Sequence, residues 1–440
     1  MDSNPFGPTS PEPSRARPPY LATRLSVQMF LAFAVQGAWV PVFSVILDEL
    51  HFSPIAASWA WATYSLSSFV TPLVWGQVAD RWVPAERCIS LCAVIDVLVL
   101  ATMATLRSPI AMFAACILFW FFMIPINSLG TALTLRQLHH PERSFGRVRL
   151  WGTVGWMVAC LLLSLWLGAI KPLLLEPSEE PRLVDGFWLA ALFALLVAVY
   201  SLTLPSTPPT PTAVTTEMPS ASLHRLQRLF DAPLSAMRLC RRRVFLTFCI
   251  CLFGFYLTYP FTTQMTPLLL AALGVQRDML PGVTTIGQTT EIAMLALLPW
   301  LLRRFGTRIT MIAGAVTWTI GMSALAVGRP LGLVIAALTT QGVFIGCFLV
   351  AGQMFVNRQS TRDVRASAQG LVVLISGAGL LAGHLSVGLV RQWTQEDYPL
   401  AFLPAACVSV VLVGVFLAGT VTARGVAVQE DSLVSPREIP

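Results

Sequence analysis

The chain has 440 residues, of which 55% are hydrophobic and only 12% are charged, and its mean hydropathy is +0.70. Soluble proteins contain about 25% charged residues, so this composition excludes an ordinary soluble enzyme and indicates an integral membrane protein. A formal net charge of +7 is compatible with nucleic-acid binding. The positive charges are distributed as membrane topology requires, however, and we expect no nucleic-acid partner.

Twelve apolar segments follow one another along the chain, most of them close to the length of a helical span. A helix needs about 20 apolar residues to cross a bilayer, whereas a β-barrel strand needs about 10 with alternating polarity. We therefore predict an all-α protein with twelve transmembrane helices. The segments are residues 23–47, 55–79, 88–106, 109–135, 148–170, 186–204, 244–273, 282–302, 308–327, 331–356, 366–390 and 399–421.

A Pro- and Thr-rich stretch with a basic end, residues 205–243, separates the sixth segment from the seventh. We expect it to form a flexible cytoplasmic linker that ends in a short amphipathic helix at the membrane surface. The predicted domains are a tail at 1–22, a six-helix half at 23–204, this linker, a second six-helix half at 244–421 and a tail at 422–440. The first apolar segment is long enough to be a span, so no cleavable signal peptide is expected.

The basic residues test this topology. Of the 29 Lys and Arg residues, 23 fall on the N-terminus, the even-numbered loops and the C-terminus, and 6 fall on the odd-numbered loops. Because basic residues concentrate on the cytoplasmic side of membrane proteins, both termini are predicted to be cytoplasmic. Asn-x-Ser/Thr glycosylation sequences are absent, which favours a bacterial cytoplasmic (inner) membrane.

Gln288 and Glu291 stand near the middle of the segment 282–302. Glu291 lies about 12 Å from the start of that segment, in a hydrocarbon core of about 30 Å. A carboxylate at this depth costs at least about 2.5–3.5 kcal/mol, so such residues usually face an interior cavity. Gln288 is three residues earlier and therefore on the same helix face. The pair is a candidate binding site, and Glu291 is a candidate proton carrier.

One motif follows the second segment, Gly76-Gln77-Val78-Ala79-Asp80-Arg81. It resembles the loop signature that the major facilitator superfamily carries between spans two and three. We expect Gly76, Asp80 and Arg81 to form a conformational loop in which Asp80 meets a neighbouring helix terminus. The sequence Arg303-Arg304-Phe305-Gly306 stands at the matching place in the second half, without the Asp.

Two further stretches narrow the resemblance. Together with the Gln288–Glu291 pair, these stretches resemble the nucleoside:proton symporter family. They are Val148-Arg149-Leu150-Trp151-Gly152-Thr153-Val154-Gly155-Trp156 and Arg365-Ala366-Ser367-Ala368-Gln369-Gly370. This resemblance implies two six-helix halves around a central cavity, with binding positions at Arg149, Thr153, Trp156, Gln288 and Glu291. It also implies a monomer in membrane lipid whose partners are protons and a nucleoside or similar small molecule.

The sequence departs from the family pattern in two spans. The family places amide side chains in span seven and an acidic residue in span ten, whereas the corresponding positions here hold Pro260, Thr263 and Gly346. These departures leave the transporter fold untouched but put the identity of the substrate in question. Polar residues close by could replace the missing groups, namely Tyr256, Tyr259, Gln264, Gln341 and Gln353.

Two other titratable residues lie inside apolar segments. Asp96, in the third segment, is a second candidate for the proton site, or it pairs with a basic residue or faces the outer vestibule. His384, in the eleventh, is a lone histidine of the kind that more often packs than functions. Glu291 could also bind the substrate directly, while Asp96 or no residue couples protons.

Motifs of other function classes are missing from the chain. It has no Gly-Lys-Ser/Thr phosphate loop, no metal-ligand cluster and no cofactor motif, so ATP-driven transport and enzymatic activity are not expected. The main hypothesis is proton-coupled uptake of a nucleoside or similar polar molecule by alternating access. The alternatives are an exporter of sugar-like or drug-like solutes with the same fold and a sensor of the same fold that does not transport.

Overall fold

The computed structural model describes residues 20–138, 141–174, 182–207, 241–359, 365–395 and 397–421, and these residues are helical almost throughout. The first part of the chain forms α1 (Leu21–Gly37), the short η1 (Val40–Val42), α2 (Phe43–Glu49), α3 (Pro54–Arg81), α4 (Ala85–Met103), α5 (Pro109–Gln137), α6 (Pro141–Leu165), the π-helical η2 (Trp166–Ile170), α7 (Lys171–Leu174) and α8 (Asp185–Ser201). The second part forms α10 (Arg243–Ala272), α11 (Leu280–Val327), α12 (Leu331–Phe344), the π-helical η4 (Ile345–Val350), α13 (Ala351–Gln359), α14 (Arg365–Trp393) and α15 (Tyr398–Val421). The all-α prediction is confirmed.

The predicted segments coincide with these helices, with one break that the prediction missed. Residues 23–47 were expected to form one helix, but α1 ends at Gly37 and α2 begins at Phe43. Pro41 lies in the η1 turn between them, and a proline cannot donate the backbone hydrogen bond of a continuous helix. The amphipathic helix expected in the linker falls largely on residues 208–240, outside the described residues.

Segments eight and nine are joined almost without a loop in α11. Gly306 interrupts the helix with φ 77° and ψ 165°, a backbone conformation that glycine adopts at no steric cost. The chain therefore reverses at the Arg303–Gly306 sequence, where the second-half counterpart of the motif was expected. By length and apolarity, eight described helical stretches suffice to cross a membrane, and α11 is one of them although it contains two predicted segments.

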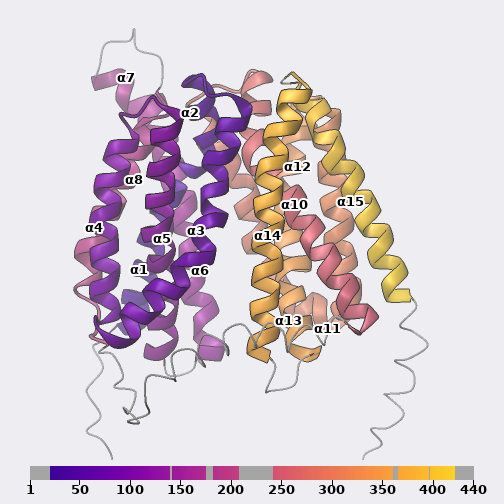
Figure 1. Cartoon of the computed structure of the whole chain (residues 1–440), viewed down its shortest axis with the longest axis horizontal. Helices are drawn as coiled ribbons and strands as arrows, with labels where there is room; N and C mark the ends of the chain where they lie inside the picture. The colour runs from indigo at the N-terminus through magenta and orange to yellow at the C-terminus, as the bar shows by residue number, and fades with distance from the viewer. Residues whose placement is uncertain are drawn as a thin grey trace, which may run out of the picture.

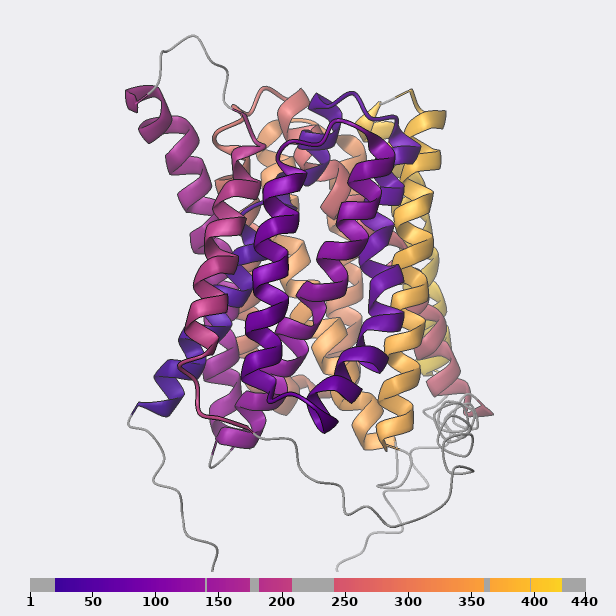
Figure 2. The ribbon, with the colours of Figure 1, turned by 60° about the vertical axis from the view of Figure 1, so that its left-hand side comes forward.

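The helices form two bundles that stand side by side (Figures 1 and 2). In the first, α1 packs on α6, α4 on α8, and α3 on α5; in the second, α10 packs on α14 and α15, and α11 on α12 and α15. The bundles meet where α3 contacts α14 and where α6 contacts α11. This architecture puts the faces of α6 and α11 that carry the predicted site residues opposite each other.

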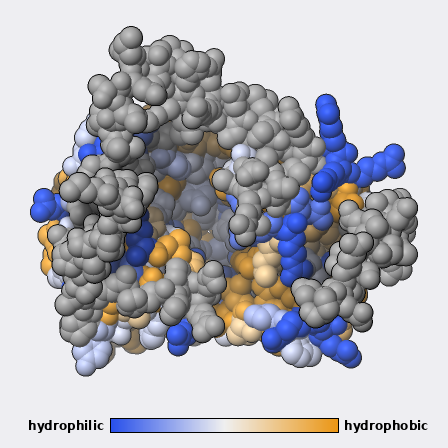
Figure 3. Space-filling model, turned by 90° about the horizontal axis from the view of Figure 1, so that it is seen from below, coloured by the Kyte–Doolittle hydropathy of each residue, from blue (hydrophilic) through white to orange (hydrophobic). Residues whose placement is uncertain are grey.

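Basic residues mark one end of the molecule. The end that carries α2 and α7 is the upper end of Figure 1, and α15 terminates at the other, lower end. Seen from below, the molecule shows hydrophilic residues around its rim and is hollowed near the middle (Figure 3). Described arginines at this lower end include Arg87 near the start of α4, Arg136 near the end of α5, Arg303 close to the Gly306 kink of α11 and Arg358 near the end of α13.

Candidate functional site

A cavity of about 590 Å³ lies between the two bundles. Residues of α1, α3, α5 and α6 line it from the first bundle, and residues of α10, α11, α12 and α14 line it from the second. Helices α4, α8 and α15 contribute no residue to this lining. Its wall extends to Gln353, which is exposed, and to Gln369 near the start of α14, so the cavity opens at the lower end.

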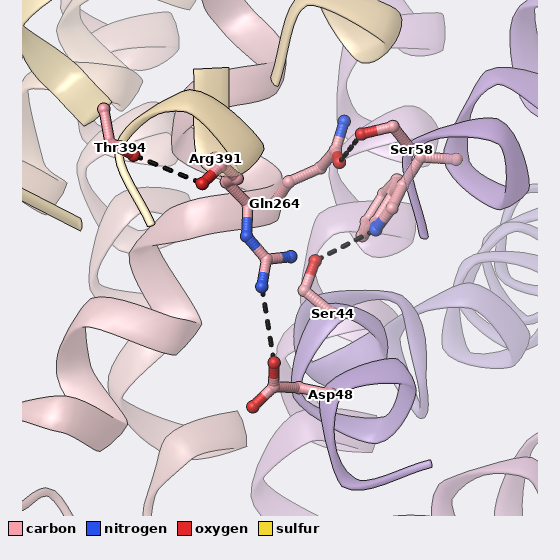
Figure 4. Close-up of polar contacts among 7 residues, drawn as sticks. Ser44, Asp48, Ser58, Gln264, Arg391 and Thr394 are labelled. Carbon is pink, nitrogen blue, oxygen red and sulfur yellow. Dashed lines mark hydrogen bonds and ion pairs between the residues drawn. The ribbon is translucent and has the colours of Figure 1, made fainter. Parts of the chain in front are cut away.

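Contacts between the bundles close the upper end of the cavity. Arg391 of α14 forms an ion pair with Asp48 of α2 at 3.3 Å, and Ser58 of α3 donates a hydrogen bond to Gln264 of α10 at 3.5 Å. Figure 4 shows both contacts, which bring segments more than 200 residues apart in sequence to one place. The cavity is therefore closed at the upper end of the molecule and open at the lower end.

The first-half wall carries the three residues predicted from α6. Arg149, Thr153 and Trp156 all line the cavity, as their spacing on one helix face predicts. The guanidinium of Arg149 lies 4.1 Å from the ring centre of Phe33, and a Cβ on Gly152 would lie only 2.8 Å from its Nη1. The missing side chain of Gly152 thus makes room for the guanidinium on the wall, where it forms a cation–π contact.

The second-half wall carries Gln288 and Glu291 of α11, which also line the cavity. A Cβ on Gly342 of α12 would lie 2.2 Å from the Glu291 backbone nitrogen, so only glycine allows α12 to approach α11 this closely. Gly37 plays the same part for Trp156, because its Cβ would lie 2.4 Å from the Trp156 carbonyl oxygen. On both walls, a close helix contact behind the residue directs its side chain into the cavity.

Arg149 and Glu291 face the cavity from opposite bundles and interact electrostatically. Among the described residues, no ion pair within 4.0 Å joins them. With histidine counted as neutral, they are the two described residues of the lining that carry a formal charge, and these formal charges cancel. The cavity therefore offers one cation and one anion that are both accessible to a bound molecule.

Four buried polar atoms of the lining have no hydrogen-bond partner within the described structure. They are Nε2 of Gln36, Nε1 of Trp156, Oγ1 of Thr266 and Oε1 of Gln288. Buried polar groups are nearly always hydrogen-bonded in proteins, so such a group is the kind that water or a ligand satisfies. The set contains two N–H donors, a carbonyl acceptor and a hydroxyl, which suits a small molecule with several hydroxyl and amide groups.

The polar residues that stood near the departures from the family pattern mostly reach the cavity. Tyr256, Tyr259, Gln341 and Gln353 line it, as does Thr263, whereas Pro260 and Gly346 do not. Gln341 donates a hydrogen bond to the Tyr259 hydroxyl at 3.0 Å. The Tyr259 ring is stacked on Trp318 at 5.8 Å, and Trp318 is in turn fixed by a hydrogen bond to Thr258. The Tyr259 phenol, which these contacts hold in place, and the Gln341 amide thus occupy this part of the wall.

The structure places Asp96 away from the cavity. It is fully buried in α4, and neither of its carboxylate oxygens has a hydrogen-bond partner among the described residues.

The predicted loop motif is helical. Gly76, Asp80 and Arg81 lie in the last turns of α3, which continues to Arg81. The side chain of Asp80 lies outside the described part of the structure, so its predicted contact stays a prediction.

Sequence reasoning missed several aromatic residues of the site. Phe33, Trp61, Tyr64 and Trp120 all line the cavity, and Tyr64 packs edge-on against Trp120 at 4.8 Å. No sequence signal separates these rings from aromatic residues that face lipid. They give the first-half wall flat apolar surfaces on which a planar ring can stack.

Comparison with known proteins places this architecture in a family. A profile of the nucleoside H+ symporter family matches residues 20–422. The chain is 26% identical to the xanthosine permease of Escherichia coli (strain K12) over 396 residues, which cover 86% of this chain and 89% of the permease. It is also 26% identical to the nucleoside permease NupG of the same organism over 419 residues, which cover 90% and 95% of the two chains.

A solved structure agrees with the fold. The crystal structure of the nucleoside transporter NupG superposes with a TM-score of 0.74 at 23% identity, covering 91% of this chain and 99% of that one. The match of the family profile extends from the start of α1 to the end of α15 and includes both walls of the cavity. The chain belongs to the nucleoside H+ symporter family.

Proposed function

We propose that this protein takes up nucleosides together with protons, and that it binds the nucleoside in the cavity between the two bundles. The family and the permeases that resemble the chain support this function. The observation that carries the binding site is the set of unpartnered polar atoms on Gln36, Trp156, Thr266 and Gln288 beside the aromatic wall. Ribose hydroxyls and base edges supply the complementary hydrogen-bonding groups, and the rings accept the base.

The charge of the lining favours a nucleoside over a nucleotide. Arg149 and Glu291 cancel one another, so the wall offers no excess of positive charge to compensate a phosphate. The volume of about 590 Å³ falls within the range of about 300–1,000 Å³ that small-molecule sites occupy. We therefore expect neutral nucleosides to be transported and nucleoside monophosphates to be rejected.

Glu291 is the proposed proton carrier. Its carboxylate faces Arg149 across the seam between the bundles, so binding a proton there removes the attraction between two oppositely charged walls. A change in that attraction alters the balance between open and closed conformations, which is what coupling requires. Thr153 is proposed to complete the substrate site. Asp96 is sealed inside the first bundle, and we propose no proton path through it.

The orientation follows from the distribution of arginines. We propose that the lower end is cytoplasmic, since basic residues concentrate on the cytoplasmic side, and that the protein lies in the bacterial inner membrane as a monomer with both termini inside. The predicted domain boundaries are kept, with halves at 23–204 and 244–421 around a cytoplasmic linker. The structure then represents the inward-open conformation of a transporter that works by alternating access.

Uptake into proteoliposomes tests this function. Purified protein is reconstituted, and the accumulation of radiolabelled uridine and adenosine is measured with an inward proton gradient, without a gradient, and with a protonophore. Accumulation that requires the gradient is expected. Nucleoside flux without any dependence on protons would contradict coupling. Flux of sugar-like or drug-like solutes without nucleoside flux would indicate the exporter, and no flux of any solute would indicate the sensor.

A further inference from the structure

His384 occupies the upper part of the cavity, where the two bundles close on each other. It belongs to α14 of the second bundle, is 4% exposed, and lines the cavity. The ring of Trp61, from α3 of the first bundle, stacks on the imidazole with centroids 5.8 Å apart and planes inclined by 18°. The Trp61 indole N–H donates to Ser44 of α2 at 2.9 Å, which fixes the ring over the histidine.

A hydrogen-bonded chain continues from the imidazole across the same seam. Nδ1 of His384 lies 2.8 Å from Nε2 of Gln264, and the carbonyl of that amide accepts a hydrogen bond from Ser58. Figure 4 shows the link between Ser58 and Gln264 close to the Arg391–Asp48 ion pair. Two of these residues, Ser58 and Trp61, belong to the first bundle, so any separation of the bundles at this end takes the Trp61 ring away from His384 and the Ser58 hydroxyl away from Gln264.

This hydrogen-bonded chain can accommodate a proton on His384 without losing its hydrogen bonds. A neutral imidazole accepts at Nδ1 from the Gln264 amide N–H, whereas a protonated imidazole donates from both nitrogens. Rotation of the amide by half a turn presents its carbonyl to the charged ring and its N–H to Ser58, whose hydroxyl can accept as well as donate. Gln264 is therefore able to serve both protonation states.

Among the described residues, no carboxylate forms an ion pair with His384 in this closed conformation. On the upper seam, Asp48 pairs with Arg391, and in the cavity Glu291 interacts with Arg149. A charged group that is taken out of water without a partner is strongly disfavoured. Within the described part of the chain, the other titratable side chains near this region on α14 and the elements packed against it are phenols and one arginine: Tyr64 of α3, Tyr256 and Tyr259 of α10, Tyr398 of α15, and Arg391 of α14 itself.

We propose that His384 is a proton-binding site of the transport cycle, which takes up a proton when the bundles separate at the upper end and releases it when Trp61 and Ser58 close over it. The proton comes from water on the upper side. It leaves to water in the cavity, which is open below in this conformation and includes His384 in its wall. This inference rests on the proposed function and adds a second proton site to Glu291.

Two transport measurements test the proposal in proteoliposomes that contain the full chain. Uridine accumulation under an inward pH gradient requires net proton binding, whereas exchange of labelled for unlabelled uridine at equal pH does not. His384→Asn is expected to lose accumulation above the external concentration and to continue exchange. His51→Asn is the matched control. His51 is an exposed histidine at the same end whose φ of 57° asparagine tolerates, and this variant is expected to behave as the wild type does.

A second variant decides the question even if His384→Asn fails to fold. Gln264→Glu places a carboxylate beside the imidazole, so the pH profile of accumulation is expected to shift to higher pH, which a merely structural role would not cause. An unchanged profile in Gln264→Glu, or wild-type accumulation in His384→Asn, overturns the proposal. Absence of uridine flux in the wild type overturns the proposed function itself, and with it this site, so the two failures are distinguishable.

Discussion

The ion pair between Asp48 and Arg391 joins the two bundles at the upper end and supports a quantitative prediction. Asp48 lies in α2 and Arg391 near the end of α14, with Nη2 and Oδ1 3.3 Å apart. The arginine side chain is 3% exposed, whereas the aspartate side chain is 41% exposed. Asp48→Asn keeps the shape of the side chain and removes its charge, so the buried guanidinium of Arg391 loses the Asp48 carboxylate only in the conformation that is closed at the upper end.

The size of the effect follows from this uneven burial. An exposed ion pair contributes about 0–1 kcal/mol, while breaking a fully buried pair costs about 3–5 kcal/mol. Water reaches Asp48, and Arg391 also lies 5.9 Å from the centre of the Tyr398 ring, so we place the loss between these two ranges, at about 1–2 kcal/mol. That free energy corresponds to a shift of about 5- to 30-fold toward the conformation that is open above.

Hydrogen–deuterium exchange with mass spectrometry measures the shift without labels. Asp48→Asn is expected to exchange faster in α2 and at the end of α14. Asp185→Asn is the matched control, because Asp185 pairs with Lys171 at 2.9 Å within the first bundle and its loss leaves the seam intact. Equal exchange at the seam in wild type and Asp48→Asn, or equal changes in both variants, would refute the reasoning.

Two further substitutions probe the walls of the cavity, and a third probes the packing of α6 on α1. Glu291→Gln is expected to abolish proton-driven accumulation of nucleosides, because an amide cannot exchange the coupling proton; accumulation at the wild-type level would exclude Glu291 as the coupling site. Trp156→Phe keeps an aromatic ring and removes the unpartnered indole N–H, so KM for uridine should rise about 2- to 10-fold for a net hydrogen bond of about 0.5–1.5 kcal/mol; an unchanged KM would mean that the N–H does not meet the substrate. Gly155→Ala puts a Cβ 2.1 Å from the Phe30 carbonyl oxygen, and we expect thermal unfolding in detergent at a lower temperature, for a loss of about 1–3 kcal/mol. Gly130→Ala, whose Cβ would meet nothing within 4 Å, is its control and should not lower that temperature.

The membrane-spanning character of the helices and the faces of the site residues were predictable because they depend on local order. Apolar length predicts a span, and helical periodicity puts Arg149, Thr153 and Trp156 on one face and Gln288 and Glu291 on another. The structure places all five on the cavity wall. The helix break near Pro41 was missed because the apolar run continues across it.

Aromatic residues illustrate why the rest of the site was not predictable. Trp120 lines the cavity and is 6% exposed, whereas Trp300 is 49% exposed on the outer surface of α11. Both stand in apolar helices, and an apolar ring meets no penalty in lipid or in a protein wall. Sequence pattern therefore does not distinguish the two positions, and only the packing of neighbouring helices does.

His384 and Gln264 show that the positions of polar residues are also decided by contacts between helices. From the sequence, His384 was a lone histidine and Gln264 a substitute for a missing family residue, yet the structure joins them by a hydrogen bond across 120 positions. By itself, the sequence determined that the chain forms apolar helices, where its basic residues lie and which side chains share a helix face, because these properties depend on neighbours along the chain. Only the tertiary structure decided which faces meet across the cavity, that the cavity is closed at one end, and that an imidazole is enclosed at the closing seam, because these depend on contacts between helices far apart in sequence.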